Sequence, residues 1–254
     1  MTSDQASTPV FQNTQLSYWD GLHANAEAFE IAELFAKNPN DLIVVITKDS
    51  TNEERIFNAL SFVTPVEIQN SVMRLSPWET LPYDLFSPHQ DIISERLSTM
   101  NYLLSERPGV VIISVATAMQ KVPPVNYLQG SSFTFAKGDQ LQLDRQKLIL
   151  EGAGYLQADI VSERGQYASR GSILDLFPMG SEFPIRLDLF DDEIETIRSF
   201  DPVSQLTIEN LDQFAILPAK EFPFDEDAIK KFRENWHNNF QGDVRRCSVY
   251  QDVS

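Results

Sequence analysis

Hydrophobic positions in the first half of the chain form short continuous runs, and stretches with helical spacing separate them. Residues 72–76 are a short strand candidate, and the runs at residues 41–48 (DLIVVITK) and 109–115 (GVVIISV) are rich in β-branched residues. Such runs are typical of strands buried on both faces of a parallel sheet. Apolar residues recur at helical intervals in residues 26–36, in residues 50–63 and in a stretch ending near Leu104. Alternating strands and helices predict a parallel α/β sheet.

A loop rich in proline and aromatic residues separates the second predicted strand from the third predicted helix. It covers residues 77–88 (PWETLPYDLFSP). We expect Ser87 to cap the following helix, because Pro88 suits a first helical position and Gln90 can reach back as in a capping box.

The pattern changes after Pro123 and Pro124, and from Gly165 onwards apolar and polar residues alternate. Residues 166–177, 184–190 and 193–200 are predicted to be three antiparallel strands, with turns at 178–181 and 191–192. Residues 141–152 are expected to form a helix ahead of them. This indicates a small α+β domain inserted after the α/β part.

The remainder of the chain is predicted to leave this inserted domain. Residues 214–218 (FAILP) are expected to return the chain to the first domain, and residues 225–240 to form a helix with acids at its start. The resulting boundaries are 1–132 for the α/β domain, 133–216 for the inserted domain and 217–254 for the return and the start of a following domain. The last residues carry no closing signal, so we expect the chain to be a piece of a longer protein.

Charge and composition narrow the classes of function. The 254 residues include 20 Lys and Arg against 37 Asp and Glu, a formal net charge of −17. DNA binding depends on Lys and Arg that displace counterions from phosphates, so general DNA binding is disfavoured. A single cysteine, Cys247, excludes an internal disulfide. The sequence shows no signal peptide and no apolar run long enough to cross a membrane, so a cytoplasmic location is expected.

Motifs for catalysis, cofactors or metals are missing from the pattern. A nucleotide-binding α/β domain needs a glycine-rich loop with a lysine before its first helix. The corresponding residues 20–26 (DGLHANA) contain one glycine and no lysine. His23, His89 and His237 are scattered, which disfavours a metal site. The acidic pair 191–192 is better explained as part of a turn than as a catalytic dyad. We therefore predict no catalytic residue, no cofactor and no metal.

One predicted strand carries an unusual outer face. In residues 184–190 (PIRLDLF), Ile185, Leu187 and Leu189 would share the core face, which leaves Arg186, Asp188 and Phe190 on the other. Binding hot spots are enriched in arginine and aromatic residues. The competing explanation is that Phe190 packs under a loop and that Arg186 and Asp188 form a surface ion pair, which would contribute little.

The preceding predicted strand contributes a further arginine. Ala168, Arg170 and Ser172 would share one face of it, with Leu174 further along. If the two strands pair, Arg170 can lie near Arg186, but the sequence does not fix the register.

Several long stretches resemble one family in order along the chain. They are residues 78–84 (WETLPYD), 87–97 (SPHQDIISERL), 163–178 (ERGQYASRGSILDLFP) and 186–195 (RLDLFDDEIE), the last running on to 200–202 (FDP). From Trp19 to the end, the chain is similar to the amino-terminal region of the bacterial transcription-repair coupling factors (Mfd). That region of the family is itself similar to the excision-repair helicase UvrB.

The resemblance implies a fold and a partner. The fold is α/β, a degenerate helicase-like parallel sheet domain without a working nucleotide site, with a smaller inserted α+β domain of antiparallel strands. The inserted domain would recruit UvrA, the damage-recognition ATPase, to stalled RNA polymerase. The translocase motor and the modules that contact RNA polymerase and DNA would lie in downstream domains, outside this chain.

Residue by residue, the resemblance assigns UvrA binding to four positions. Arg170 matches the second arginine of the UvrB-type F-R-V-R-G stretch, and Arg186, Asp188 and Phe190 match an R-x-acid-x-F strand. Ala168 replaces the first arginine of F-R-V-R-G. The loop at residues 78–88 is also too short for the UvrB hairpin that grips DNA, so the chain departs from UvrB at two places.

Two other readings accompany this adaptor role. The chain is alternatively a divergent UvrB-like helicase fragment that binds ATP and DNA, against which the missing lysine and the acidic charge argue. It is also expected, from the resemblance, that a C-terminal domain of the intact protein masks the UvrA-binding face. That masking is compatible with the adaptor role.

Overall fold

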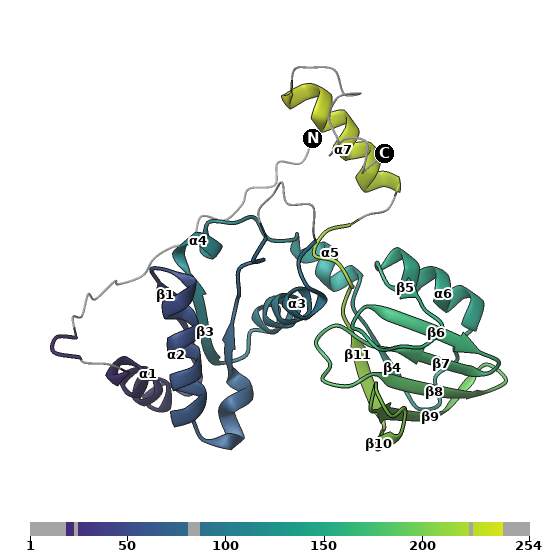
Figure 1. Ribbon diagram of the computed structural model, residues 1–254, viewed down its shortest axis with the longest axis horizontal. Coiled ribbons are helices and arrows are strands. Elements are labelled where there is room, and N and C mark those ends of the chain that lie inside the picture. Colours follow the sequence, from purple (N-terminus) through teal and green to yellow (C-terminus); the bar gives the residue numbers. More distant parts are fainter. Residues whose placement is uncertain (1–18, 23–24, 81–86, 224–225, 241–254) are drawn as a thin grey trace.

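The computed structural model describes residues 19–22, 25–80, 87–223 and 226–240. Figure 1 shows an α/β lobe built from the first half of the chain, a second lobe built around a long antiparallel sheet, and the helix α7 standing apart from both. The fold class expected from the sequence is confirmed.

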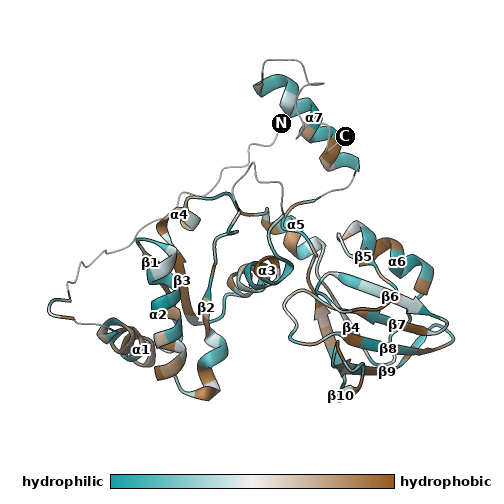
Figure 2. Cartoon of the chain, viewed as in Figure 1, coloured by the Kyte–Doolittle hydropathy of each residue, from teal (hydrophilic) through white to brown (hydrophobic). Residues whose placement is uncertain are grey.

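A three-stranded parallel sheet forms the centre of the α/β lobe. Its strands are β1 (Leu42–Thr47), β3 (Gly109–Ser114) and β2 (Val72–Arg74), in the order β1-β3-β2. Helices α1 (Ala26–Lys37) and α2 (Ser50–Val63) cover one face, and α3 (Gln90–Leu104) lies on the other (Figure 1). The short η1 (Val66–Ser71) leads into β2, and α4 (Val115–Ala118) follows β3. In Figure 2, β3 is hydrophobic along most of its length, as expected between two helical layers.

The prediction that the first strand is buried on both faces is wrong. Ile43 and Val45 pack against the α1 and α2 core, but Leu42, Val44 and Ile46 are 43%, 53% and 64% exposed. The reason is positional, because β1 is an edge strand and α3 packs on the β2 side of the sheet. No described helix covers the second face of β1.

The start of α3 also differs from the prediction. The helix begins at Gln90, and its N-cap is His89, whose Nδ1 accepts a hydrogen bond from the Asp91 N–H at 3.3 Å. Ser87 is therefore not the cap, because the backbone stays extended through His89. Residues 81–86 of the preceding predicted loop lie outside the described residues.

The second lobe contains a six-stranded sheet in the order β10-β9-β8-β7-β6-β5. All neighbours are antiparallel except the pair β5–β6. The strands are β5 (Leu156–Gln157), β6 (Gln166–Arg170), β7 (Ile173–Leu176), β8 (Ile185–Phe190), β9 (Glu193–Phe200) and β10 (Thr207–Leu211). The helix α6 (Leu143–Gly152) packs on one face of this sheet through Leu150, which shares a core with Leu174 and Leu187.

The region predicted as one strand at residues 166–177 is a hairpin. Arg170 pairs with Ile173, so Gly171 and Ser172 form a two-residue turn between β6 and β7. Gly171 has φ +61°, a conformation that glycine adopts without steric cost. The chain reversal places Leu174 on the core face, so the predicted grouping of Leu174 with Ala168 and Arg170 is wrong.

The segment predicted to return the chain to the first domain, residues 214–218, begins inside the second lobe. Residues 213–216 form β11 (Gln213–Ile216), which pairs with β4 (Phe133–Ala136) in a separate two-stranded sheet. The segment 214–218 therefore still belongs to the second lobe. The helix α5 (Val125–Gly130) connects the two lobes ahead of β4.

The two lobes share one hydrophobic core and one buried ion pair. The core joins Leu97 and Met100 of α3 to residues of the second lobe such as Phe135 and Leu187. Arg96 of α3 is fully buried and donates to the Glu221 carboxylate, with Nε–Oε1 at 2.5 Å and Nη2–Oε2 at 3.1 Å. Trp78 donates to the same carboxylate at 2.9 Å, so α3 and the preceding loop are both tied to the exit of the second lobe.

The last described helix is α7 (Glu226–Asn239), none of whose residues is buried. This confirms the predicted helix over 226–239, and residue 225 lies outside the described part. Phe232, Trp236 and Phe240 follow one another along one side, the first pair tilted with ring centroids 5.5 Å apart and the second pair stacked at 4.5 Å. Among the described residues, no helix is long and apolar enough to cross a membrane.

Replacing Glu221 with alanine is expected to destabilise the protein by about 3–5 kcal/mol, because Arg96 would remain buried without a counter-charge. Urea unfolding followed by circular dichroism measures this change. Glu30→Ala, at an exposed position of α1, is the matched control and should shift stability by less than about 0.5 kcal/mol. Equal effects of the two substitutions would show that the buried pair does not stabilise the fold.

Candidate protein-binding face

The alternation predicted for the strand at residues 184–190 is present in β8. Ile185, Leu187 and Leu189 are buried in the shared core. Arg186, Asp188 and Phe190 point to the opposite face of the sheet, and Phe190 is 71% exposed. Phe190 therefore does not pack under a loop, which removes the competing explanation for this aromatic residue.

The strand register places all four predicted site residues on one face. Ala168, Asp175 and Arg186 lie in one cross-strand row, and Arg170, Ile173 and Asp188 lie in the next. Arg170 is therefore in line with Asp188, with β7 between them, and does not neighbour Arg186. Its guanidinium instead donates to the Asp159 carbonyl oxygen. We call this outer surface of β6 to β9 the arginine face.

Arg186 is held in a fixed orientation by its neighbours. Its Nε and Nη2 donate to the two carboxylate oxygens of Asp175 at 2.7 and 2.8 Å, and Nη2 also reaches Gln205 at 3.3 Å. The guanidinium carbon lies 4.6 Å from the ring centroid of the buried Phe200. The hydrogen bonds to Asp175 raise the pKa of Arg186, and the charge of Arg186 is therefore permanent.

Asp188 is held in the same way by β9. It accepts hydrogen bonds from Arg198 Nη2 and, at 2.9 Å, from the Thr196 hydroxyl. Asp188 and Arg186 are thus not ion-paired with each other, as the competing explanation required. Each belongs to a separate pair, Asp175–Arg186 and Asp188–Arg198.

A small apolar cluster supports the arginine face. Val161, Ala168, Phe177 and Phe200 form a buried group separate from the main core. Ala168 is buried within it, and an arginine at this position would have to displace the cluster. The replacement of the first arginine of the UvrB-type stretch therefore has a packing reason in this chain.

Three residues of the face were missed by the sequence reasoning, namely Asp175, Arg198 and Gln205. Asp175 could have been found from the sequence, because it is an acid within the apolar stretch ILDLF. In the structure it is buried beside Arg186. Arg198 lies in a strand that the sequence did predict, but its partner depends on register. Gln205 comes from the turn after β9 and gave no signal.

The described residues at the start of α1 do not suit a nucleotide phosphate. The N-cap of α1 is Asn25, and its first turn presents the acid Glu27. Arg55 of α2 donates to both side chains. An acid at the helix N-terminus opposes an incoming phosphate. Residues 23 and 24 of the predicted phosphate-loop position lie outside the described part of the chain.

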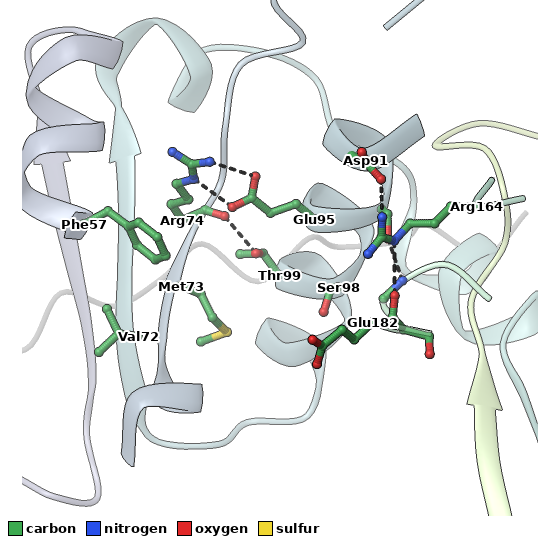
Figure 3. Close-up of a pocket in the computed structure, with 13 residues that line it drawn as sticks. Phe57, Val72, Met73, Arg74, Asp91, Glu95, Ser98, Thr99, Arg164 and Glu182 are labelled. Carbon is green, nitrogen blue, oxygen red and sulfur yellow. Dashed lines mark hydrogen bonds and ion pairs between the residues drawn. The ribbon is translucent and has the colours of Figure 1, made fainter. Parts of the chain in front are cut away.

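A cavity of about 520 Å³ between the lobes carries paired charges. It lies among β2, α3 and residues 180–182 (Figure 3). Arg74 donates to Glu95 at 2.7 Å, and Arg164 pairs with Asp91. Because carboxylates of α3 already neutralise both arginines, and Glu182 adds another, the lining does not favour a phosphate.

The described residues contain no group of three or more His, Cys, Asp and Glu that could hold a metal ion. His89 caps α3 and His237 lies on α7. His23 and Cys247 lie outside the described residues.

Comparison with known proteins bears on this face directly. A family model described as the UvrB interaction domain matches residues 133–222. This part of the chain is similar to a UvrB interaction domain. The match begins at the residue predicted to start the inserted domain, ends beyond the predicted residue 216, and contains the whole arginine face.

Most of the chain is homologous to the transcription-repair coupling factors. It is 47% identical to that of Escherichia coli (strain K12) over 84% of the chain, and 44% identical to that of Haemophilus influenzae over 90%. The factor of Bacillus subtilis (strain 168) is 30% identical over 79%. The family resemblance seen in the sequence is thus confirmed. The chain spans about a fifth of the length of these curated relatives, with 18%, 20% and 17% of each covered.

Phe190→Ala is expected to leave stability within about 0.5 kcal/mol of the parent, because this ring buries little on folding. Leu187→Ala, one position before Asp188 on the buried side of the same strand, should cost about 2–5 kcal/mol. Urea unfolding of both variants tests the assignment of the two faces. A large loss for Phe190→Ala would mean that the ring serves folding and is not free to bind.

Proposed function

We propose that this chain is the non-catalytic adaptor part of a transcription-repair coupling factor and that it recruits UvrA to stalled RNA polymerase in nucleotide excision repair. The observation that carries the proposal is the arginine face. It presents Arg170, Arg186, Asp188 and Phe190 together, within the UvrB interaction domain.

The physical properties of the face suit a protein partner. Phe190 is a large apolar ring that folding leaves in water, so burying it against a partner supplies a favourable free energy. The charged side chains beside it are already oriented by Asp175, Arg198 and Thr196. Preorganised side chains lose less conformational entropy on binding, which favours affinity.

The α/β lobe is proposed to act as a scaffold. Its α3 helix shares a core with the second lobe and holds Glu221 through Arg96, so the arginine face has a fixed orientation relative to the first lobe. The domain limits 1–132, 133–216 and 217–254 are proposed for these parts. Contacts with RNA polymerase and DNA, and the ATP-driven motor, are assigned to other parts of the longer protein. Masking of the face by a C-terminal domain remains a prediction about that longer protein.

The alternative function is a UvrB-like fragment that binds ATP and DNA. Glu27 in the first turn of α1 and the net charge of −17 both disfavour it. A fluorescent ATP analogue that bound this chain at micromolar concentration would favour this alternative over the adaptor.

Calorimetric titration of the chain with purified UvrA is expected to show saturable binding. Arg186→Ala and Phe190→Ala should each weaken it by about 2 kcal/mol or more, as for hot-spot residues. Arg145→Ala is the control, because Arg145 is exposed on α6, which covers the opposite face of the sheet.

The outcomes distinguish whether the chain binds UvrA at all from whether it binds UvrA through the arginine face. Binding that survives both Arg186→Ala and Phe190→Ala would place the UvrA contact elsewhere on the chain. The absence of binding by the unmodified chain would contradict the adaptor function itself. Circular dichroism of each variant confirms that a loss of binding does not come from unfolding.

A further inference from the structure

Two arginines lie directly opposite each other in the centre of the arginine face. Arg186 of β8 and Arg198 of β9 are partners in the strand register. Like charges directly opposite across a sheet are destabilising. Here Asp175 flanks the pair on the β7 side, and Asp188 lies one position further along the face and pairs with Arg198.

Arg198 also lowers the stability of the fold through an unsatisfied hydrogen-bond donor. Its Nε is buried and finds no acceptor among the described residues. An unsatisfied buried donor costs stability, and the partly buried ion pair with Asp188 has to offset that cost. The side chain of Arg198 is 32% exposed. The stability of the fold therefore does not explain the unpaired Nε of Arg198.

Both guanidinium groups keep donors for a further acceptor. Asp175 and Gln205 occupy Nε and Nη2 of Arg186, and Asp188 occupies Nη2 of Arg198. Nη1 of each arginine has no acceptor among the described residues. Two neighbouring guanidinium groups with free N–H donors match the two oxygens of one carboxylate.

The local charge contrasts with the rest of the chain. Arg170, Arg186 and Arg198 share the face with three carboxylates, those of Asp175, Asp188 and Glu193, which leaves this face without net charge. The whole chain has a net charge of −17. A face without net charge therefore repels an acidic side chain of a partner less than the rest of this acidic chain does.

We propose that Arg198, together with Arg186, forms a subsite that binds a carboxylate of the partner protein. This inference rests on the proposed function, because the partner is the protein that docks on the arginine face, and it names the chemistry of its contact. Asp or Glu of the partner would lie across the two Nη1 groups, beside the apolar contact made by Phe190.

The test is the affinity of the chain for purified UvrA at several salt concentrations, measured by calorimetry for four proteins. They are the parent, Arg198→Ala, Arg198→Lys and the control Arg145→Ala. Arg198→Ala should weaken binding by at least about tenfold. The affinity of Arg198→Lys should lie between those of the parent and Arg198→Ala, because lysine keeps the charge but loses the bidentate geometry. Arg145→Ala should bind like the parent.

Salt dependence distinguishes a direct contact from an effect on Asp188. A lost charge–charge contact makes the affinity of Arg198→Ala less sensitive to salt than that of the parent. A loss of affinity with unchanged salt sensitivity would show that Arg198 only orients Asp188, and would overturn the subsite.

The remaining outcomes test the subsite and the adaptor function separately. If Arg198→Ala binds like the parent while Arg186→Ala does not, the subsite is wrong and the adaptor function stands. If the parent itself does not bind UvrA, the adaptor function and the subsite both fail. Circular dichroism shows whether Arg198→Ala is folded. If it is unfolded, the affinity of Arg198→Lys and its salt dependence test the subsite instead.

Discussion

The burial of one face of the six-stranded sheet is the constraint on which the rest of the structure depends. Leu174, Leu187 and Ile197 pack into a core shared with α3 of the first lobe. Because side chains alternate along a strand, this packing fixes which residues stand on the outer face. The arginine face is thus set by what lies beneath it, and a shift of one residue in register would bury its charges.

The buried pair of Arg96 and Glu221 extends this constraint to the whole molecule. It lies where the chain leaves the second lobe and ties that exit to α3. The two lobes therefore form one body with a common core. A helicase-like α/β lobe that presents an acid where a phosphate would bind still has a physical role in such an arrangement, since it fixes the orientation of its neighbour.

Local pattern was enough to predict most elements and the outward direction of Arg186, Asp188 and Phe190. Period-two alternation needs no tertiary information, so the faces of β8 followed from the sequence. The exposed face of β1 could not be predicted from the sequence, because exposure depends on which helix covers a strand. The register between paired strands could not be predicted from the sequence either. The hairpin at Gly171 separates Arg170 from Arg186 by a whole strand, and Arg198 lies beside Arg186 only through pairing of β8 with β9.

The charges of the arginine face are better explained by recognition than by stability. Asp175–Arg186 and Asp188–Arg198 lie at a partly exposed surface, where ion pairs contribute little to the free energy of unfolding. Arranging them costs something, since two arginines stand opposite each other and one Nε is left without an acceptor. In the proposed complex a partner would cover the face, and the exclusion of water would strengthen each charged contact that the sheet has already oriented.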